Sequence, residues 1–296
     1  LLHHILIWSK ERKEVTYTDL QKVIQHVKDA ASKTETLEVL KNNYISEVSF
    51  KNQTINKNLD NYFDGKSARP EHIINKLPIR RKFWEEQVLD NLFKYDIVVI
   101  KASSGQGKST LAWQSAKIFE EEFNFNIYEL HYCDDETKVE ELYDFFKTRL
   151  EIGELPLIVI DGLNKDVSRY KLLLERLFGF SIKIIITTRE EDWNIYKPDI
   201  SKHDLNILNI NLLINEAKNI FEELKKKNRI VEDIKTWQPS WEKIKDKALL
   251  IEYVYLLTHG DMLKDRLEFQ IKCIQEEENE SAVKIEILRV ISLADI

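Results

Sequence analysis

The sequence predicts an α/β fold in which a mainly parallel sheet is covered by helices. Short apolar runs recur along the middle of the chain, at residues 97–100, 127–132, 157–160, 182–186 and, as a fifth short strand, 205–210. Amphipathic stretches, such as 139–146 and 170–177, lie between these runs. This alternation is typical of parallel strands joined by helices, because a strand buried on both faces is almost continuously apolar. With 7 glycines and 5 prolines among 296 residues, the rest of the chain is expected to be mainly helical.

Four segments are predicted along the chain. Residues 1–60 are expected to be helical, since Thr18 and Gln21 have the spacing of a capping box before residues of helical periodicity. Residues 61–228 contain the α/β core, and residues 229–280 form a helical domain. Its packing stripe is Leu263, Leu267, Ile271 and Ile274. Residues 281–296 begin a last domain that is cut short, so the chain is expected to be a piece of a longer polypeptide.

Composition excludes several classes of protein. The net charge of −7 argues against nucleic acid as the partner of the whole surface. Cys133 and Cys273 provide neither a disulfide framework nor metal-ligand spacing, which is typical of reduced thiols in a cytoplasmic protein. No segment resembles a signal peptide, and the longest apolar run, at 248–257, is about half the length of a membrane span. A cytoplasmic protein without membrane contact is therefore expected.

A phosphate-binding loop is predicted at residues 102–110, directly after the first apolar run. The segment matches the relaxed form of the P-loop pattern, with Ala102 where the standard pattern has glycine. Small residues let successive backbone N–H groups face a polyphosphate, and the following helix adds the positive end of its dipole. We expect Lys108 to reach the β- and γ-phosphates of ATP, and the Ser109 hydroxyl to bind Mg²⁺. The candidate nucleotide-binding residues of the loop are Ser104, Gly105, Gln106, Gly107, Lys108, Ser109 and Thr110.

Asp161 ends the apolar run 157–160, which is the form of a Walker B strand. At a strand end, its carboxylate is expected to hold Mg²⁺ through water and to act in catalysis together with Lys108. Gly162 follows, where many P-loop ATPases have a second acid that activates the attacking water. Spacing identifies no substitute base, although Asp166, Glu190 and Glu191 are acids that the fold can bring near. Slow hydrolysis is therefore predicted.

Arg189 follows a third strand end, after Thr187 and Thr188. A guanidinium at this place can pair with phosphate oxygens in a bidentate manner and so report whether a γ-phosphate is present. An arginine alone would be interpreted as part of a surface ion pair. The order of the loop, Asp161 and Arg189 on successive strand ends instead favours a catalytic role.

These motifs, with residues 216–221, resemble the STAND class of signal-transduction NTPases, which are related to NB-ARC and NACHT modules. The segment 77–81 is similar to the apolar-plus-arginine segment with which that class contacts adenine, so the resemblance implies nucleotide binding by Ile79 and Arg80. It also implies that residues 229–280 are a lid domain and that residues 281–296 begin a winged helix. The whole looks closest to the bacterial antiviral, Avs-type STAND proteins.

For function, the resemblance implies an ATP- and Mg²⁺-dependent switch that is also a slow ATPase in antiviral defence. An N-terminal effector, connected through residues 1–60, and a C-terminal sensor would belong to the same longer chain. A protein trigger bound to the sensor would start assembly into an oligomer. Two features depart from the class: Gly162 replaces an acid, and residues 247–250 contain no Gly-x-Pro motif.

Two other functions are considered. A P-loop kinase needs an acceptor pocket and cationic lid residues, and Arg149, Arg169 and Arg176 do not lie in a recognisable lid segment. An AAA-type ATPase on DNA needs an acid after Asp161 and an arginine finger, for which Arg229 and Arg266 are candidates. The missing acid and the acidic net charge weaken this alternative.

Overall fold

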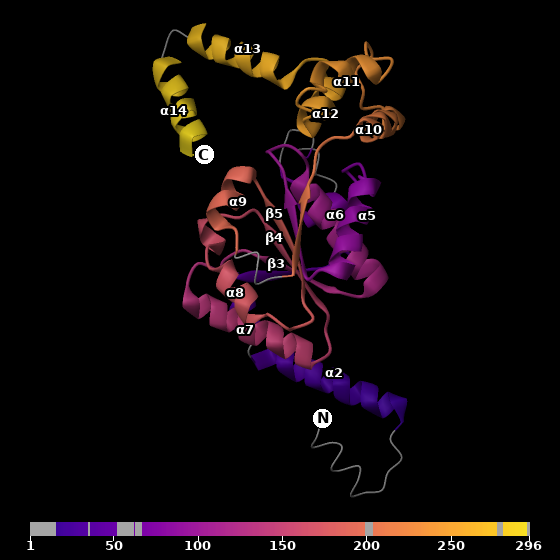
Figure 1. Cartoon of the computed structure of the whole chain (residues 1–296), viewed down its shortest axis with the longest axis vertical. Helices are drawn as coiled ribbons and strands as arrows, with labels where there is room; N and C mark the ends of the chain where they lie inside the picture. Colours follow the sequence, from indigo (N-terminus) through magenta and orange to yellow (C-terminus); the bar gives the residue numbers. More distant parts are fainter. Residues whose placement is uncertain are drawn as a thin grey trace, which may run out of the picture. The chain divides into compact units, whose positions relative to one another are not determined.

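The computed structural model describes residues 16–34, 36–51, 62, 67–198, 204–276 and 281–294. The chain divides into two compact units, Leu1–Ile210 and Asn211–Ile296. The first unit contains the sheet and the candidate site, and the described part of the second unit is helical (Figure 1). Of the segment 1–60 treated above as helical, residues 1–15, 35 and 52–60 lie outside the described residues.

The sheet of the first unit has six strands in the order β1-β3-β4-β5-β2-β6. The strands are β1 (Ile45–Val48), β2 (Ile97–Lys101), β3 (Asn126–Leu130), β4 (Pro156–Asp161), β5 (Lys183–Thr188) and β6 (Leu205–Asn209). β1 pairs antiparallel with β3, and the remaining pairs are parallel. The predicted α/β class is therefore confirmed, with all five expected strands present. β1 was not predicted, because it is a four-residue strand, buried only at its two ends, inside a segment expected to be helical.

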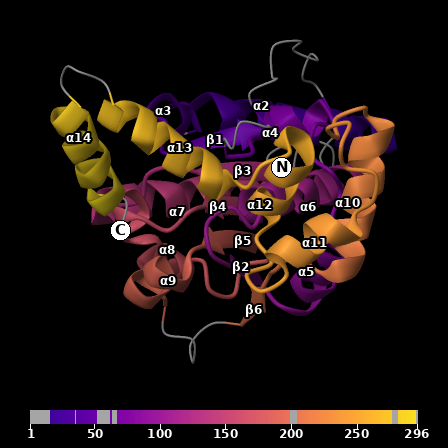
Figure 2. The ribbon, with the colours of Figure 1, turned by 90° about the horizontal axis from the view of Figure 1, so that it is seen from above.

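Helices cover both faces of this sheet. The helices described in the first unit are α2 (Tyr17–Thr34), α3 (Thr36–Lys41), α4 (Pro70–Ile74), α5 (Lys82–Lys94), α6 (Lys108–Phe123), α7 (Glu136–Glu151), α8 (Tyr170–Arg176) and α9 (Glu190–Tyr196), with a 3₁₀ turn, η2 (Lys165–Val167). Figure 2 shows α7, α8 and α9 on one face and α4, α5 and α6 on the other. Near-continuous burial along β2, β4 and β5 follows from this two-sided cover.

Alternation along β4 assigns its side chains to the two faces. Ile158 and Ile160 belong to the core cluster that also contains residues of α7 and α8. Because successive side chains of a strand point to opposite faces, Val159 and Asp161 lie on the face covered by α6. The carboxylate at the end of β4 is thus placed on the same side as the helix that follows the phosphate loop.

The cap of α2 differs from the prediction. Thr16 rather than Thr18 caps the helix: the backbone N–H of Asp19 donates to Thr16 Oγ1 at 3.3 Å, and Thr16 Oγ1 donates to Asp19 Oδ2 at 2.6 Å. The sequence contains two overlapping pairs with the spacing of a capping box, Thr16 with Asp19 and Thr18 with Gln21. The earlier pair forms the cap because the helix begins at Tyr17.

The second unit contains α10 (Ile214–Lys226), α11 (Gln238–Ile244), α12 (Leu250–His259), α13 (Leu263–Glu276) and α14 (Ser281–Ala294). The Tyr253 hydroxyl on α12 donates to the Ala217 carbonyl on α10 at 3.0 Å and joins these two helices. Within the predicted stripe of α13, Leu267 and Ile271 are 49% and 43% exposed. The residues described after 280 form one helix, so the winged helix is not shown and stays a prediction.

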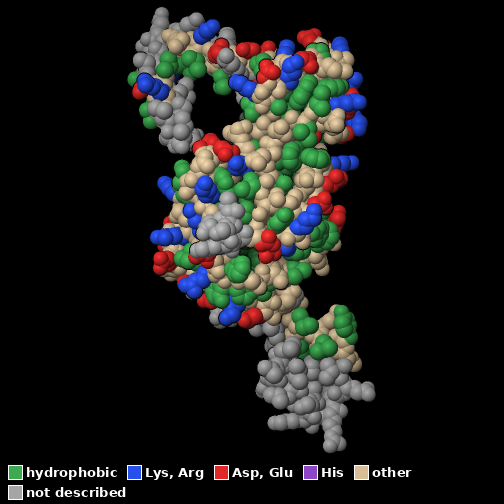
Figure 3. Space-filling model, viewed as in Figure 1, with side chains coloured by type: hydrophobic (Ala, Val, Ile, Leu, Met, Phe, Trp, Pro, Cys, Tyr) green, Lys and Arg blue, Asp and Glu red, His purple; other side chains and the backbone are tan. Residues whose placement is uncertain are grey.

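The surface of the described residues is of mixed charge. On the face drawn in Figure 3, basic and acidic side chains are interspersed. Among the described residues, every helix is too short or too polar to cross a lipid bilayer.

Candidate phosphate-binding site

The loop between β2 and α6 has a backbone that only glycine adopts easily at two positions. Gly105 and Gly107 have φ angles of 76° and 75°, in the left-handed region. Gly107 is the N-cap residue of α6, and it brings no side chain that would cover the first turn. The loop therefore leads into the positive end of a helix dipole without a side-chain cap.

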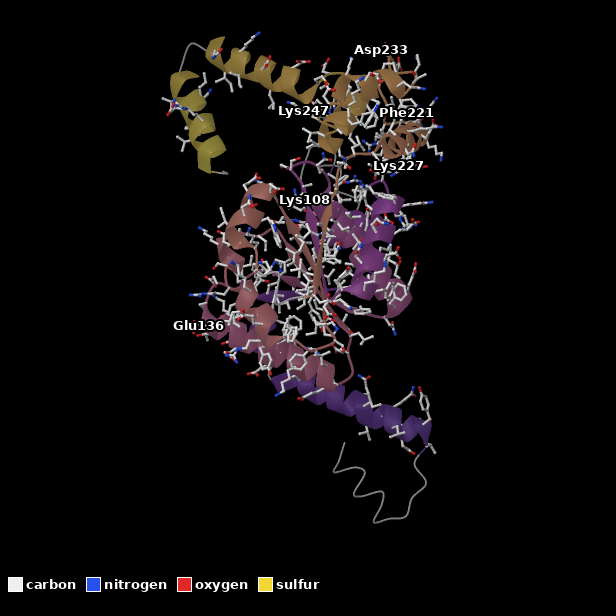
Figure 4. All side chains as sticks on the ribbon, in the orientation of Figure 1. Lys108, Glu136, Phe221, Lys227, Asp233 and Lys247 are labelled. Carbon is white, nitrogen blue, oxygen red and sulfur yellow. The ribbon has the colours of Figure 1, made fainter. Side chains whose placement is uncertain are left out.

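Lys108, which Figure 4 labels, is the first residue of α6. Its Nζ donates to the Ser103 carbonyl at 2.9 Å. Burial lowers the pKa of Lys108, and the nearby positive charge of Arg189 lowers it further, while Asp161 acts in the opposite direction. Two cations from different strand ends are therefore held close enough to repel each other.

Asp161 is held by three side chains from two elements, β5 and α6. Thr187 Oγ1 on β5 donates to Asp161 Oδ1 at 2.7 Å, and Ser109 and Trp113 on α6 also hydrogen-bond to the carboxylate. Burial raises the pKa of Asp161, whereas these hydrogen bonds and the Lys108 charge lower it. The arrangement places the carboxylate against the first turn of α6.

Arg189 is the N-cap residue of α9, directly after β5. β5 lies between β2, which leads into the loop, and β4, which ends at Asp161. Asp161 is thus not on the strand next to β2, and α6 reaches it across the end of β5. The structure brings together Lys108, Ser109 and Asp161, with Arg189 within electrostatic range of Lys108.

The oxygen ligands at this site fit a magnesium ion. The Ser109 hydroxyl and the Asp161 carboxylate are hydrogen-bonded neighbours. Mg²⁺ is typically bound by one or two protein oxygens together with waters and substrate phosphates, rather than by a complete cage of protein ligands. The described residues contain no group of three or more His, Cys, Asp or Glu side chains that could hold a metal ion.

Sequence reasoning missed the role of Arg81. This side chain is 3% exposed, and its Nη1 donates to the Gln106 carbonyl at 2.6 Å. In a trans peptide group the carbonyl and the following N–H point in opposite directions, so this bond directs the Gly107 N–H away from Arg81. A buried guanidinium therefore fixes the orientation of a loop peptide. No local pattern distinguishes Arg81 from the adjacent Arg80.

Ile79 and Arg80 occupy different surroundings from Arg81. The Ile79 carbonyl accepts a hydrogen bond from Gln114 Nε2 on α6 at 3.3 Å. Arg80 Nε donates to Glu85 Oε2 at 2.9 Å, and the Arg80 side chain is 59% exposed. Contact of these two residues with adenine stays a prediction.

The segment 51–76, which is polar and rich in asparagine as linkers are, contacts α6 at two positions. Ser67 Oγ donates to Ser109 Oγ at 3.2 Å, and the Tyr62 hydroxyl lies 3.3 Å from Thr110 Oγ1. Both contacts are made to the first turn of the helix after the loop. Nothing in the composition of residues 51–76 distinguishes these two positions from a linker.

Comparisons with known proteins identify no family. No family model matches the sequence, and no curated protein matches it. Among solved structures, a chain of the E. coli MS115-1 HORMA:CdnC:Trip13 complex is similar at 13% sequence identity and a TM-score of 0.37, over 69% of this chain and 89% of that chain. C. elegans PCH-2 is similar at 14% identity and a TM-score of 0.32, over 51% of this chain and 45% of that chain.

The predicted membership of the STAND class is wrong. Neither a family model nor a curated protein supports it, and a Trip13 complex and PCH-2 are among the matching solved structures. The motifs that carried the resemblance, a phosphate loop and two polar strand ends, follow from the chemistry of nucleotide binding and do not define one class. The antiviral role, the effector and the sensor were implied by the resemblance alone.

Proposed function

We propose that the first unit binds ATP with Mg²⁺ at residues 102–110 and acts as a slow ATPase that serves as a nucleotide-dependent switch. The observation that carries the proposal is the convergence of Lys108, Ser109 and Asp161 at the start of α6, with the charge of Arg189 close by. The two cations suit the phosphates of magnesium-bound ATP, and the Ser109 hydroxyl and the Asp161 carboxylate suit its metal ion.

The mutual repulsion of Lys108 and Arg189 supports an anionic ligand. Burial is the main cause of the lowered pKa of Lys108, and the positive charge of Arg189 lowers this pKa further. A polyphosphate bound between them replaces this repulsion with two attractions. A site of this kind favours multiply charged anions over singly charged ones.

In the proposed complex, the backbone N–H groups of residues 104–107 and the first turn of α6 surround the phosphates. Lys108 pairs with β- and γ-phosphate oxygens, Ser109 binds Mg²⁺, and Asp161 holds the metal through water. Arg189 pairs with the γ-phosphate. ATP and ADP then differ at Arg189, which gives the switch its two states.

A switch acts on other proteins or on other parts of its own chain. Exposed apolar side chains on the last two helices of the second unit offer contact area: Leu267, Ile271, Val283, Ile287 and Val290. We include self-association into an oligomer, domains of a longer chain and a protein trigger in the proposal. A P-loop kinase and a DNA-associated ATPase are the alternative outcomes of the experiment below.

The proposal is tested by comparing the affinities for Mg·ATP and Mg·ADP in the parent protein and in Arg189→Ala. We expect the parent to bind Mg·ATP about tenfold more tightly than Mg·ADP, since one charge-assisted pair with the γ-phosphate is worth roughly 1.5 kcal/mol or more. Arg189→Ala should lose most of this preference while Mg·ADP affinity stays the same.

Arg176→Ala is the matched control, because Arg176 is an exposed arginine of the same unit that pairs with Glu140 on α7. It should leave the preference for ATP intact. Equal affinities of the parent for the two nucleotides would contradict the switch. Release of ADP that depends on an added acceptor would favour a kinase, and stimulation of turnover by DNA would favour the DNA-associated ATPase.

A further inference from the structure

Glu129 lies on the strand next to Asp161 and on the same face of the sheet. It is in β3, and its register partner in β4 is Val159, two residues before Asp161. Register partners point to the same face, and so do residues two apart along a strand. Strand spacing and rise place the Cα atoms of Glu129 and Asp161 about 8 Å apart. Both carboxylates therefore face the side covered by α6.

The surroundings of Glu129 suit proton transfer near neutral pH. Burial raises the pKa of Glu129 to about 7, the negative charges of Asp161 and Glu71 add to the rise, and Arg69 opposes it. His131 Nε2 lies 3.9 Å from Glu129 Oε2. A base is most effective when its pKa is close to the working pH, because it is then deprotonated and still accepts a proton readily.

The acids considered from the sequence are less suited to this role. Glu190 is 61% exposed at its side chain, and its carboxylate pairs with Lys101 at 2.9 Å. Glu191 is exposed. Asp166 lies in η2, a turn after β4, and not on a strand next to Asp161. Glu129 is partly buried, and it lies on the strand next to Asp161 with its register partner two residues before that carboxylate.

We propose that Glu129 is the carboxylate that accepts a proton from the water that attacks ATP, in place of the acid missing at Gly162. This inference rests on the proposed function. The water oxygen forms a bond to the γ-phosphorus while the bond from this phosphorus to the oxygen that bridges to the β-phosphate breaks. The water proton passes to the Glu129 carboxylate, and the bridging oxygen leaves on ADP with the bonding electron pair.

Glu129→Gln tests the proposal, because the amide keeps the shape of the side chain and cannot act as the base. Hydrolysis is followed in a single turnover with radiolabelled ATP and protein in excess, so that a slow rate is still measurable. We expect the rate to fall by about 100-fold or more. The affinity for Mg·ATP should stay within about threefold of the parent value.

Glu47→Gln is the control, because Glu47 pairs with Tyr128 in the β1–β3 register and so lies on the opposite face of the sheet. It should hydrolyse ATP at the parent rate. Glu129→Asp, which keeps the charge but withdraws the carboxylate by one methylene, is a second variant if the amide does not fold. It should lose rate without losing affinity.

The outcomes separate the inference from the proposed function. A parent protein that does not bind Mg·ATP overturns the proposed function itself. If the parent binds and hydrolyses ATP, parent-like rates in a folded Glu129→Gln, or in Glu129→Asp where only that variant folds, overturn the role of Glu129 alone. The role of Glu129 is also overturned if the parent binds Mg·ATP tightly and does not hydrolyse it.

Discussion

Thr187 and Asp161 are register partners on neighbouring strands, and the Thr187 hydroxyl donates to the Asp161 carboxylate at 2.7 Å. Because Thr187 is 2% exposed, this hydrogen bond is shielded from water. It stabilises the ionised form of Asp161 against burial, which raises the pKa of the same group. A side chain of β5 therefore favours the charged form of Asp161, the candidate magnesium ligand at the end of β4.

Thr187→Val should weaken the magnesium-dependent binding of ATP. The substitution keeps the shape and removes the donor, so we expect a loss of about 1 kcal/mol in the free energy of unfolding and a further rise in the pKa of Asp161. Mg·ATP affinity should fall by about threefold to tenfold. Calorimetric titration at several magnesium concentrations measures the effect.

Thr258→Val is the control for this variant. The Thr258 hydroxyl donates to the Val254 carbonyl at 2.9 Å on α12, in the second unit. Its loss should affect stability without changing nucleotide affinity. An unchanged affinity in Thr187→Val would show that the hydrogen bond to Asp161 has no part in ligand binding.

Arg81→Ala should disorganise the phosphate loop. It removes a charge-assisted hydrogen bond to the Gln106 carbonyl, and we expect a loss of about 1 to 3 kcal/mol in the free energy of unfolding, measured by urea denaturation. Nucleotide affinity should fall as well, because the Gly107 N–H loses its fixed direction. Lys82→Ala, at an exposed neighbouring position, should stay within about 0.5 kcal/mol of the parent. Equal stabilities of the two variants would refute the anchoring role of Arg81.

The stability of the parent should decrease as pH rises through the range in which Glu129 titrates. Folding raises the pKa of Glu129 from about 4.5 to about 7, so the folded state holds more protons than the unfolded state between these values. Stability is therefore highest below the lower pKa and is lost as pH rises to the higher one. The charged groups acting on Glu129 are Asp161, Glu71 and Arg69, with His131 in ion-pair range.

Glu129→Gln removes this titration and supplies the measurement. The melting temperature of the variant minus that of the parent should increase by about a few degrees between about pH 5 and about pH 8. Glu86→Gln, which removes an exposed carboxylate on α5, is the control. A difference between Glu129→Gln and the parent that does not change with pH would mean that Glu129 titrates normally.

Much of the sheet was predictable because burial on both faces leaves almost continuous apolar runs. β2, β4 and β5 are of this kind, and each polar residue at a strand end marks the edge where ligands bind in such sheets. The short edge strand β1 is partly exposed and lacks this signal. Its pairing with β3 depends on tertiary contacts that no local pattern encodes.

The sequence predicted those residues of the candidate site that belong to local motifs, but not the residues that contact the site from other elements. Lys108 and Asp161 belong to recognisable patterns, since a loop and a strand end place them locally. Arg81 and Glu129 act through contacts across elements, and their sequence neighbours give no sign of those contacts. The resemblance to one class of NTPases led to a wrong prediction. Motifs typical of phosphate binding occur in many classes of protein and do not indicate one architecture.

The most direct test of the central claim is the calorimetric titration of Mg·ATP into the parent protein and into Lys108→Ala, with Lys117→Ala as a control on the same helix. We expect the parent and the control to bind with equal affinity, and Lys108→Ala to bind about 10-fold to 100-fold more weakly, as the loss of one charge-assisted phosphate contact requires. Equal binding by Lys108→Ala and the parent would contradict the assignment of residues 102–110 as the phosphate site.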